Sequence, residues 1–198
     1  MNVKGLVGKK IEFLTVPYAC IHGFSVQTAG ALLDRDTELT LYTNAVNSEL
    51  YKLRQDFRHG KANLWAIQKV LCNKILGPDS APLDGVAQYD GQSQGAGILG
   101  ILTGNEVPID KNAMNAVLHS DPPILQGSET VEICFQGYRD ITLFTTKRVV
   151  LIDKKGLFAK KVEYFSIPWA KFVAFGVRSA GAFLDFDTEV LLYTEMGF

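Results

Sequence analysis

The chain has 198 residues, of which 47% are hydrophobic and 21% are charged, and its formal net charge is −1. These proportions are typical of a globular protein that buries a core. Lys and Arg number 10 against 6 Asp and Glu in residues 1–76, 1 against 6 in residues 77–128, and 9 against 9 in residues 129–198. Because no segment has the concentrated basic face that nucleic-acid binding requires, we expect no nucleic-acid partner.

The N-terminal third predicts strands followed by one helix. Alternating polar and apolar residues favour strands over residues 9–17, 20–28 and 37–43, and a further strand over residues 50–60. Residues 62–76 then predict a helix, because apolar side chains recur at helical spacing. Its predicted apolar stripe consists of Leu64, Ile67, Val70, Leu71 and Ile75.

The rest of the chain predicts a linker, a short helix and six strands. Residues 77–94 are rich in Gly, Pro, Ser, Asp and Gln, which is typical of a flexible linker. Residues 109–120 predict a short helix with Asp110 near its N-terminus, ended by Pro122 and Pro123. The six predicted strands span residues 130–138, 140–146, 148–154, 160–168, 171–179 and 188–194. Many short strands at near-regular spacing favour an antiparallel barrel or sandwich.

A long internal repeat relates the two ends of the chain. A shift of 151 positions aligns residues 4–43 with residues 155–194 without a gap, and 21 of these 40 positions are identical. This period is too long for a solenoid unit. The sequence therefore predicts two copies of one module.

Three stretches resemble the bacterial pleckstrin-homology (PH-like) domain family. They are "GILGILTGNEVPID" from residue 97, the block of strands over residues 139–190, and "DFRHGKANLWAIQKVL" from residue 56. The resemblance implies a mainly β fold, a seven-stranded bent antiparallel barrel capped by a C-terminal helix. It divides the chain into a partial unit over 1–76 (strands four to seven and the helix), a linker over 77–94, and a unit over 95–198 (a lead-in helix and strands one to six).

Neither copy is complete by this comparison. The first copy lacks its N-terminal strands, and the second lacks its last strand and helix. One interpretation is that the chain is a fragment of a longer array of modules. The other is that residues 49–76 complete the barrel begun at residue 129. A barrel without its last strand and helix would leave an open edge and an uncovered core.

The sequence contains no pattern that indicates catalysis. "GAGILG" at residues 95–100 has the spacing of a dinucleotide fingerprint, but no strand precedes it and no parallel βαβ pattern surrounds it. The acidic run of Asp34, Asp36 and Glu38 is typical of a turn before a strand. We therefore expect no catalytic residue, no cofactor-binding residue, no metal ligand and no cofactor.

The cysteines and the absence of targeting signals predict the compartment. Cys20, Cys72 and Cys134 are odd in number, widely spaced and flanked by apolar residues, which favours reduced, buried thiols. No stretch reaches the roughly 18 apolar residues of a membrane span, and the first residues lack a signal-peptide core. We expect a cytoplasmic protein.

Lysines flank the predicted third hairpin of each copy. They are Lys9, Lys10, Lys154, Lys155, Lys160 and Lys161. Lysines in such a hairpin could contact an anionic lipid headgroup, although eukaryotic PH domains that bind phosphoinositides use basic residues near the first hairpin. Family resemblance favours a non-enzymatic binding or scaffold module that acts through protein–protein contacts and forms homo-oligomers. A peripheral membrane module that binds lipid through these lysines is the alternative.

Overall fold

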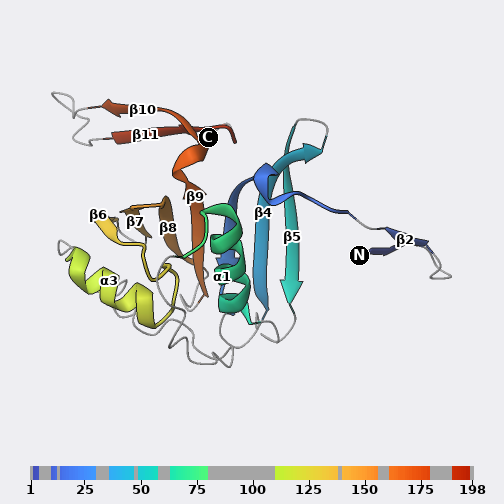
Figure 1. The fold of residues 1–198 in the computed structure, drawn as a ribbon, viewed down its shortest axis with the longest axis horizontal. Coiled ribbons are helices and arrows are strands. Elements are labelled where there is room, and N and C mark those ends of the chain that lie inside the picture. Colours follow the sequence, from blue (N-terminus) through green and yellow to red (C-terminus); the bar gives the residue numbers. More distant parts are fainter. Residues whose placement is uncertain are drawn as a thin grey trace.

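The computed structural model describes ten segments of the chain. They are residues 2–4, 10–12, 14–29, 36–46, 49–57, 63–79, 110–137, 140–155, 161–178 and 189–196. The elements in chain order are β1 (Asn2–Lys4), β2 (Lys10–Glu12), η1 (Tyr18–Cys20), β3 (Ile21–Gln27), β4 (Thr37–Val46), β5 (Glu49–Phe57), α1 (Leu64–Ile75), α3 (Lys111–Ser120), β6 (Val131–Gln136), β7 (Asp140–Thr145), β8 (Arg148–Lys155), β9 (Lys161–Pro168), η3 (Trp169–Lys171), β10 (Phe172–Arg178) and β11 (Glu189–Thr194). Figure 1 shows their arrangement.

One seven-stranded antiparallel sheet combines both copies of the repeat. Its strand order is β5-β4-β3-β9-β8-β7-β6, so the first copy supplies three adjacent strands and the second copy supplies four. The sheet is bent, and its outer strands are β5 and β6. The expected mainly β, PH-like architecture is confirmed.

The joint between the copies is the pairing of β3 with β9. Phe24 lies opposite Ser166 and Gln27 lies opposite Glu163. Beyond the strand end, the Thr28 amide donates to the Val162 carbonyl at 2.9 Å, and the Val162 amide donates to Thr28 Oγ1 at 3.0 Å. These bonds tie residues 134 positions apart in the sequence.

This pairing bears on whether the second copy is completed from within the chain. The segment that completes the sheet begins at Ile21, not at residue 49, because β3 and β4 enter the sheet together with β5 and α1. They occupy the place expected for the second copy's own strands five and six, β10 and β11. The boundaries 1–76, 77–94 and 95–198 remain predictions about the sequence. The main sheet contains strands from both the first and the last of these units.

The main hydrophobic core is also built from both copies. Val26, Leu64 and Trp65 of the first copy pack with Ile141, Leu143, Val150, Ile152, Val162 and Tyr164 of the second, and with Met114 and Leu118 of α3. The indole of Trp65 meets the ring of Tyr164 edge-on, with centroids 5.7 Å apart. Helix α1 lies over the middle of the sheet and α3 lies near β6 (Figure 1).

Both of the α-helices in the described residues begin at capping residues that the sequence supplies. Asn63 Oδ1 accepts from the Ala66 amide at 3.0 Å, and Asp110 Oδ1 accepts from the Asn112 amide at 3.0 Å. The predicted apolar stripe of α1 was partly wrong, because Val70 is 50% exposed. The buried face is rotated toward Trp65 and Cys72. The contact of Trp65 with Tyr164 on β9 turns this face of α1 toward the sheet, which the apolar spacing within the helix alone did not predict.

Two short hairpins stand apart from the main sheet. β10 pairs only with β11, and β1 pairs only with β2, within the part of the chain that the structure describes. Their registers repeat those inside the main sheet. Phe175 lies opposite Leu192 as Phe24 lies opposite Leu41, and Asn2 lies opposite Glu12 as Asp153 lies opposite Glu163. Each hairpin is therefore a second version of a pair of strands that the main sheet already contains.

Candidate functional site

The β10–β11 hairpin exposes a face that the first copy buries. Phe175 is 79% exposed and Val177 is 70% exposed, whereas their counterparts Phe24 and Val26 are 0% exposed. Other large apolar residues exposed on the hairpin are Val173, Val190 and Tyr193. Leaving apolar area of this kind in water is costly.

The difference between the copies follows from what covers each face. Phe24 packs with Leu71 and Cys72 of α1. The repeat ends at the strand corresponding to β4, and no described helix lies against β10 and β11. The same residue types are therefore core in one copy and surface in the other.

The base of the hairpin is fixed to the main sheet through the two 3-10 turns. Lys171 Nζ in η3 donates to the carbonyl of Ala19 in η1 at 3.3 Å. His22 Nδ1, at the start of β3, lies 2.8 Å from Glu195 Oε2 after β11. Trp169 Nε1 donates to the Thr145 carbonyl at 2.7 Å. These contacts hold the base of the hairpin while its apolar face stays open.

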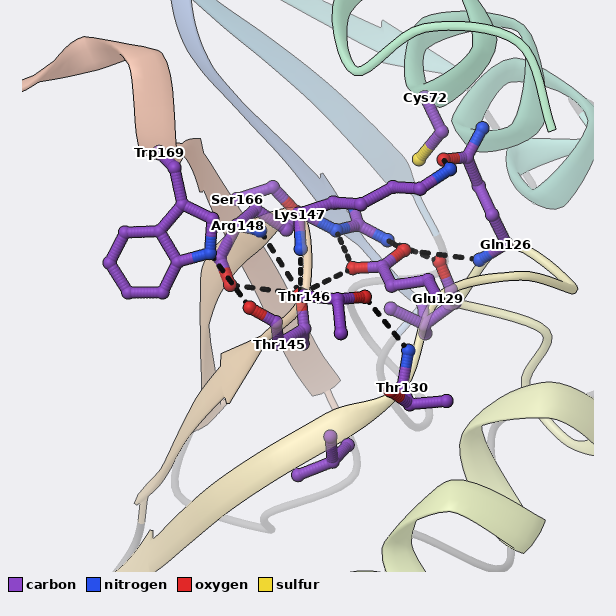
Figure 2. Close-up of polar contacts among 12 residues, drawn as sticks. Cys72, Gln126, Glu129, Thr130, Thr145, Thr146, Lys147, Arg148, Ser166 and Trp169 are labelled. Carbon is purple, nitrogen blue, oxygen red and sulfur yellow. Dashed lines mark hydrogen bonds and ion pairs between the residues drawn. The ribbon is translucent and has the colours of Figure 1, made fainter. Parts of the chain in front are cut away.

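A buried polar cluster lies under this base (Figure 2). The side chains of Arg148 on β8 and Glu129 are both 0% exposed. Arg148 Nε donates to Glu129 Oε1 at 2.9 Å, and Nη2 donates to Glu129 Oε2 at 3.0 Å. Nη1 donates to Ser166 Oγ at 2.9 Å, and Nη2 also donates to the Ile124 carbonyl at 2.6 Å. A bidentate pair of this kind, supported by further hydrogen bonds, is how a buried arginine is stabilised.

The carboxylate of Glu129 is equally well satisfied. Thr145 Oγ1 donates to Oε1 at 2.7 Å, and the Gln126 amide donates to Oε2 at 3.1 Å. Burial by itself would raise the pKa of Glu129, but the charge and hydrogen bonds of Arg148, with those of Thr145 and Gln126, hold it below its usual value. The cluster has the properties of a structural ion pair, because both charges are enclosed and are hydrogen-bonded to each other.

Burial raises the thiol pKa of two of the cysteines. Cys72 is 1% exposed, and burial raises the pKa of its thiol. Burial also raises the pKa of the Cys134 thiol. Protonated thiols are poor nucleophiles. Within the described ranges, no three His, Cys, Asp or Glu side chains are grouped so as to hold a metal ion.

The lysines singled out from the sequence lie in different settings. Lys9 and Lys160 lie outside the described residues, and so does the sequence "GAGILG". Lys10 belongs to the backbone of β2. Lys154 is half-buried on β8.

The other two lysines have acidic partners. Lys155 Nζ lies 2.6 Å from Asp153 Oδ2 and 3.3 Å from Glu163 Oε2, and the hydrogen bond to Asp153 is the main cause of its raised pKa. Lys161 is 8% exposed, and its Nζ lies 2.7 Å from Glu38 Oε1 on β4. That ion pair joins the two copies, so Lys161 stabilises the β3–β9 joint. Lipid binding by these lysines stays a prediction.

Sequence reasoning missed the two most informative features. The exposed hairpin face could have been found from the repeat, since Phe175 and Val177 match Phe24 and Val26 and no helix among the described residues covers them. The Arg148–Glu129 pair had a weaker sequence signal, because the only hint was an arginine at the first position of β8, directly before several apolar residues.

The fold defines a class, that of mainly β proteins with a bent antiparallel sheet of the PH type. A family model described as the bacterial PH domain matches residues 1–75 and 102–197. The chain belongs to this family. The two matched regions correspond to the two copies of the repeat.

Individual relatives match about half of the chain or less. An uncharacterized Bacillus subtilis (strain 168) protein, YjqA, is 43% identical over 70 residues, and this match covers 35% of the present chain and 55% of the relative. A PH domain from Shewanella amazonensis SB2B is 40% identical, with a TM-score of 0.37 over 49% of this chain and 75% of its own. A DUF1696 family protein with a PH domain from Shewanella loihica PV-4 is 34% identical, with a TM-score of 0.40 over 46% and 74%. Among the described residues, no helix combines the length and apolar character needed to cross a membrane.

Proposed function

We propose that this chain is a non-enzymatic binding and scaffold module that acts through protein–protein contacts, including self-association. The observation that carries the proposal is the exposed apolar face of β10–β11, where Phe175 and Val177 are 79% and 70% exposed. A hairpin with a core-type face and an unpaired strand edge is a receptive surface for another polypeptide.

The chemistry of the remaining sites supports a binding role over catalysis. The buried Arg148–Glu129 pair is enclosed and joined by two hydrogen bonds, and the Cys72 thiol is kept protonated by burial. Catalytic acids, bases and nucleophiles need access to a substrate and a pKa suited to proton transfer. Neither of these buried groups has that access.

Sedimentation velocity over a range of protein concentrations tests the proposal. We expect the parent chain to form oligomers at micromolar concentration. The variant carrying Phe175→Glu and Val177→Glu is expected to sediment as a monomer with an unchanged melting temperature, because both side chains lie outside the core. Val70→Glu is the matched control, since Val70 is exposed to a similar degree on α1. A parent chain that stays a compact monomer would contradict the proposal.

A further inference from the structure

Two of the unpaired edges of the separate hairpins, in the described part of the chain, correspond to strands that pair with each other inside the main sheet. One edge belongs to β2 and the segment Leu14–Val16 that comes after it, and the other belongs to β10. Figure 1 shows β1–β2 and β10–β11 extending away from the main sheet on opposite sides. Within a single chain, these two edges therefore do not meet.

The main sheet shows how these two edges would fit together. In the internal joint, Phe24 lies opposite Ser166 and Ser25 lies opposite Phe165. The repeat shift of 151 positions converts these pairs into Phe175 opposite Thr15 and Gly176 opposite Leu14. The registers of β1–β2 and β10–β11 already equal those of β8–β9 and β3–β4. Each hairpin therefore has the same internal register as its counterpart in the main sheet.

The apolar side chains at these positions are complementary. In the internal joint, the rings of Tyr42 and Phe165 pack with centroids 5.0 Å apart. Their counterparts are Tyr193, which is 46% exposed, and Leu14, which is 55% exposed. Both lie on the surface of one chain, and the proposed pairing would bring them together.

The sequence also has opposite charges at the corresponding positions of the two hairpins. The internal joint contains the ion pair between Lys161 Nζ and Glu38 Oε1, at 2.7 Å, and both side chains are largely buried. The repeat places Lys10 at the position of Lys161 and Glu189 at the position of Glu38. A lysine on β2 and a glutamate on β11 therefore provide the same opposite charges.

We propose that the β10–β11 hairpin of one copy of this chain adds to the β1–β2 hairpin of a second copy, with Phe175 opposite Thr15 and Gly176 opposite Leu14. This inference rests on the proposed self-association and specifies its interface. β10 extends the sheet of the second copy by antiparallel backbone pairing, which is β-augmentation. The contact is head-to-tail, because each copy gives a donor hairpin at one place and an acceptor hairpin at another. Such contacts generate rings or open chains of copies.

The outer strands β5 and β6 are the competing acceptor edges. β6 exposes Ile133 and Phe135. Neither strand lies in the repeated segments, so neither one corresponds to β9, the strand that pairs with β3 in the internal joint. The segment after β2 does have them, because Leu14–Val16 corresponds to Phe165–Ile167 of β9.

Cysteine cross-linking between copies tests the register. One preparation carries Leu14→Cys and the other carries Gly176→Cys. After mixing and mild oxidation, we expect a disulfide-linked species of twice the chain mass, with the joined peptides identified by mass spectrometry. Directly opposite residues in antiparallel strands have Cα atoms about 4.5–5.5 Å apart, within the range that a disulfide spans. Leu14→Cys mixed with Gln55→Cys on β5 is the control and should not cross-link.

Charge reversal tests the same interface without oxidation. Lys10→Glu and Glu189→Lys are each expected to weaken self-association by about tenfold, because each change places like charges opposite one another. A chain with both changes restores opposite charges at every interface. We expect it to regain the parent affinity, measured by sedimentation velocity.

The outcomes separate this inference from the proposed function. Concentration-dependent assembly without the 14–176 cross-link, or assembly unaffected by either charge reversal, would overturn the proposed pairing and leave self-association standing. A parent chain that is monomeric at every concentration would overturn both. A chain carrying both Leu14→Cys and Gly176→Cys should give a ladder of linked copies. An internal disulfide in a monomer would show instead that the hairpins pair within one chain.

Discussion

At the scale of single residues, the Arg148–Glu129 pair is expected to make stability depend on pH. The folded-state pKa of Glu129 is lowered from its ordinary value of 4.5. A carboxyl group with a lowered folded pKa contributes stability that is fully present above the unfolded pKa and is lost as the pH falls through the folded pKa. The contribution of Glu129 should therefore be complete at neutral pH and should decrease below about pH 4.5.

Replacing Glu129 by glutamine tests this assignment. Removing one partner of a buried pair leaves the other charge uncompensated, which costs about 3–5 kcal/mol. Glu129→Gln should lower the melting temperature at neutral pH and should reduce the loss of stability on acidification. Thermal unfolding followed by circular dichroism from pH 7 to pH 3 measures both. An unchanged acid limb in the variant would mean that other carboxyl groups cause the pH dependence.

Gly23 is expected to be essential for the close approach of β3 to β9. A Cβ atom at this position would lie 3.1 Å from Phe165 Cε2 and 3.2 Å from the Ser166 carbonyl oxygen. Gly23→Val should destabilise the fold by about 1–3 kcal/mol through overpacking. The matched control is Ala174→Val, at the corresponding exposed position of β10, which should be nearly neutral. Chemical denaturation of both variants gives the comparison, and equal losses would argue against a tight β3–β9 joint.

At the scale of elements, the β8–β9 hairpin is expected to have little affinity for anionic membranes. Lys155 and Lys161 are paired with acidic residues, and an ion pair reduces the charge offered to a headgroup. The parent chain should not sediment with anionic vesicles, even at low salt where electrostatic attraction is least screened. Strong sedimentation that is abolished by Lys154→Glu with Lys155→Glu would favour the membrane module instead. Lys161 is left unchanged because its ion pair supports the sheet.

The strands and helices themselves were largely predictable from the sequence. The alternation in residues 20–28 predicted β3, and Asp110 marked the start of α3, because both signals are local. The partner of β9 was not predictable in this way. β3 and β10 carry nearly the same pattern, so the local sequence fits either strand beside β9.

The choice of partner for β9 depends on the elements that come next in the chain. β3 and β4 lead into β5 and α1, which bring Leu64 and Trp65 into the core beside Tyr164. After β10 and β11 there is no equivalent described element. The pairing of β3 with β9 thus brings these apolar side chains into the core, and burial of this kind is the largest favourable term in folding.

At the scale of the whole molecule, the two copies act as complementary parts of one sheet. The first copy contributes the last strands and the helix, and the second contributes the first four strands. The remaining strands of each copy form the two separate hairpins. The proposed interaction surface is thus a consequence of the repeat, since both copies encode strands for the same position and the sheet has room for one set.

The most direct test of this arrangement is a pair of cysteine variants that compares β3 and β10 as neighbours of β9. Gln27 lies opposite Glu163 in the structure, and Arg178 is the residue that would replace Gln27 if β10 occupied the position of β3. We predict that a chain with Gln27→Cys and Glu163→Cys forms an internal disulfide at monomer mass, and that a chain with Arg178→Cys and Glu163→Cys does not. The reverse result, a disulfide only between positions 178 and 163, would show that each copy keeps its own strands and would contradict the shared sheet.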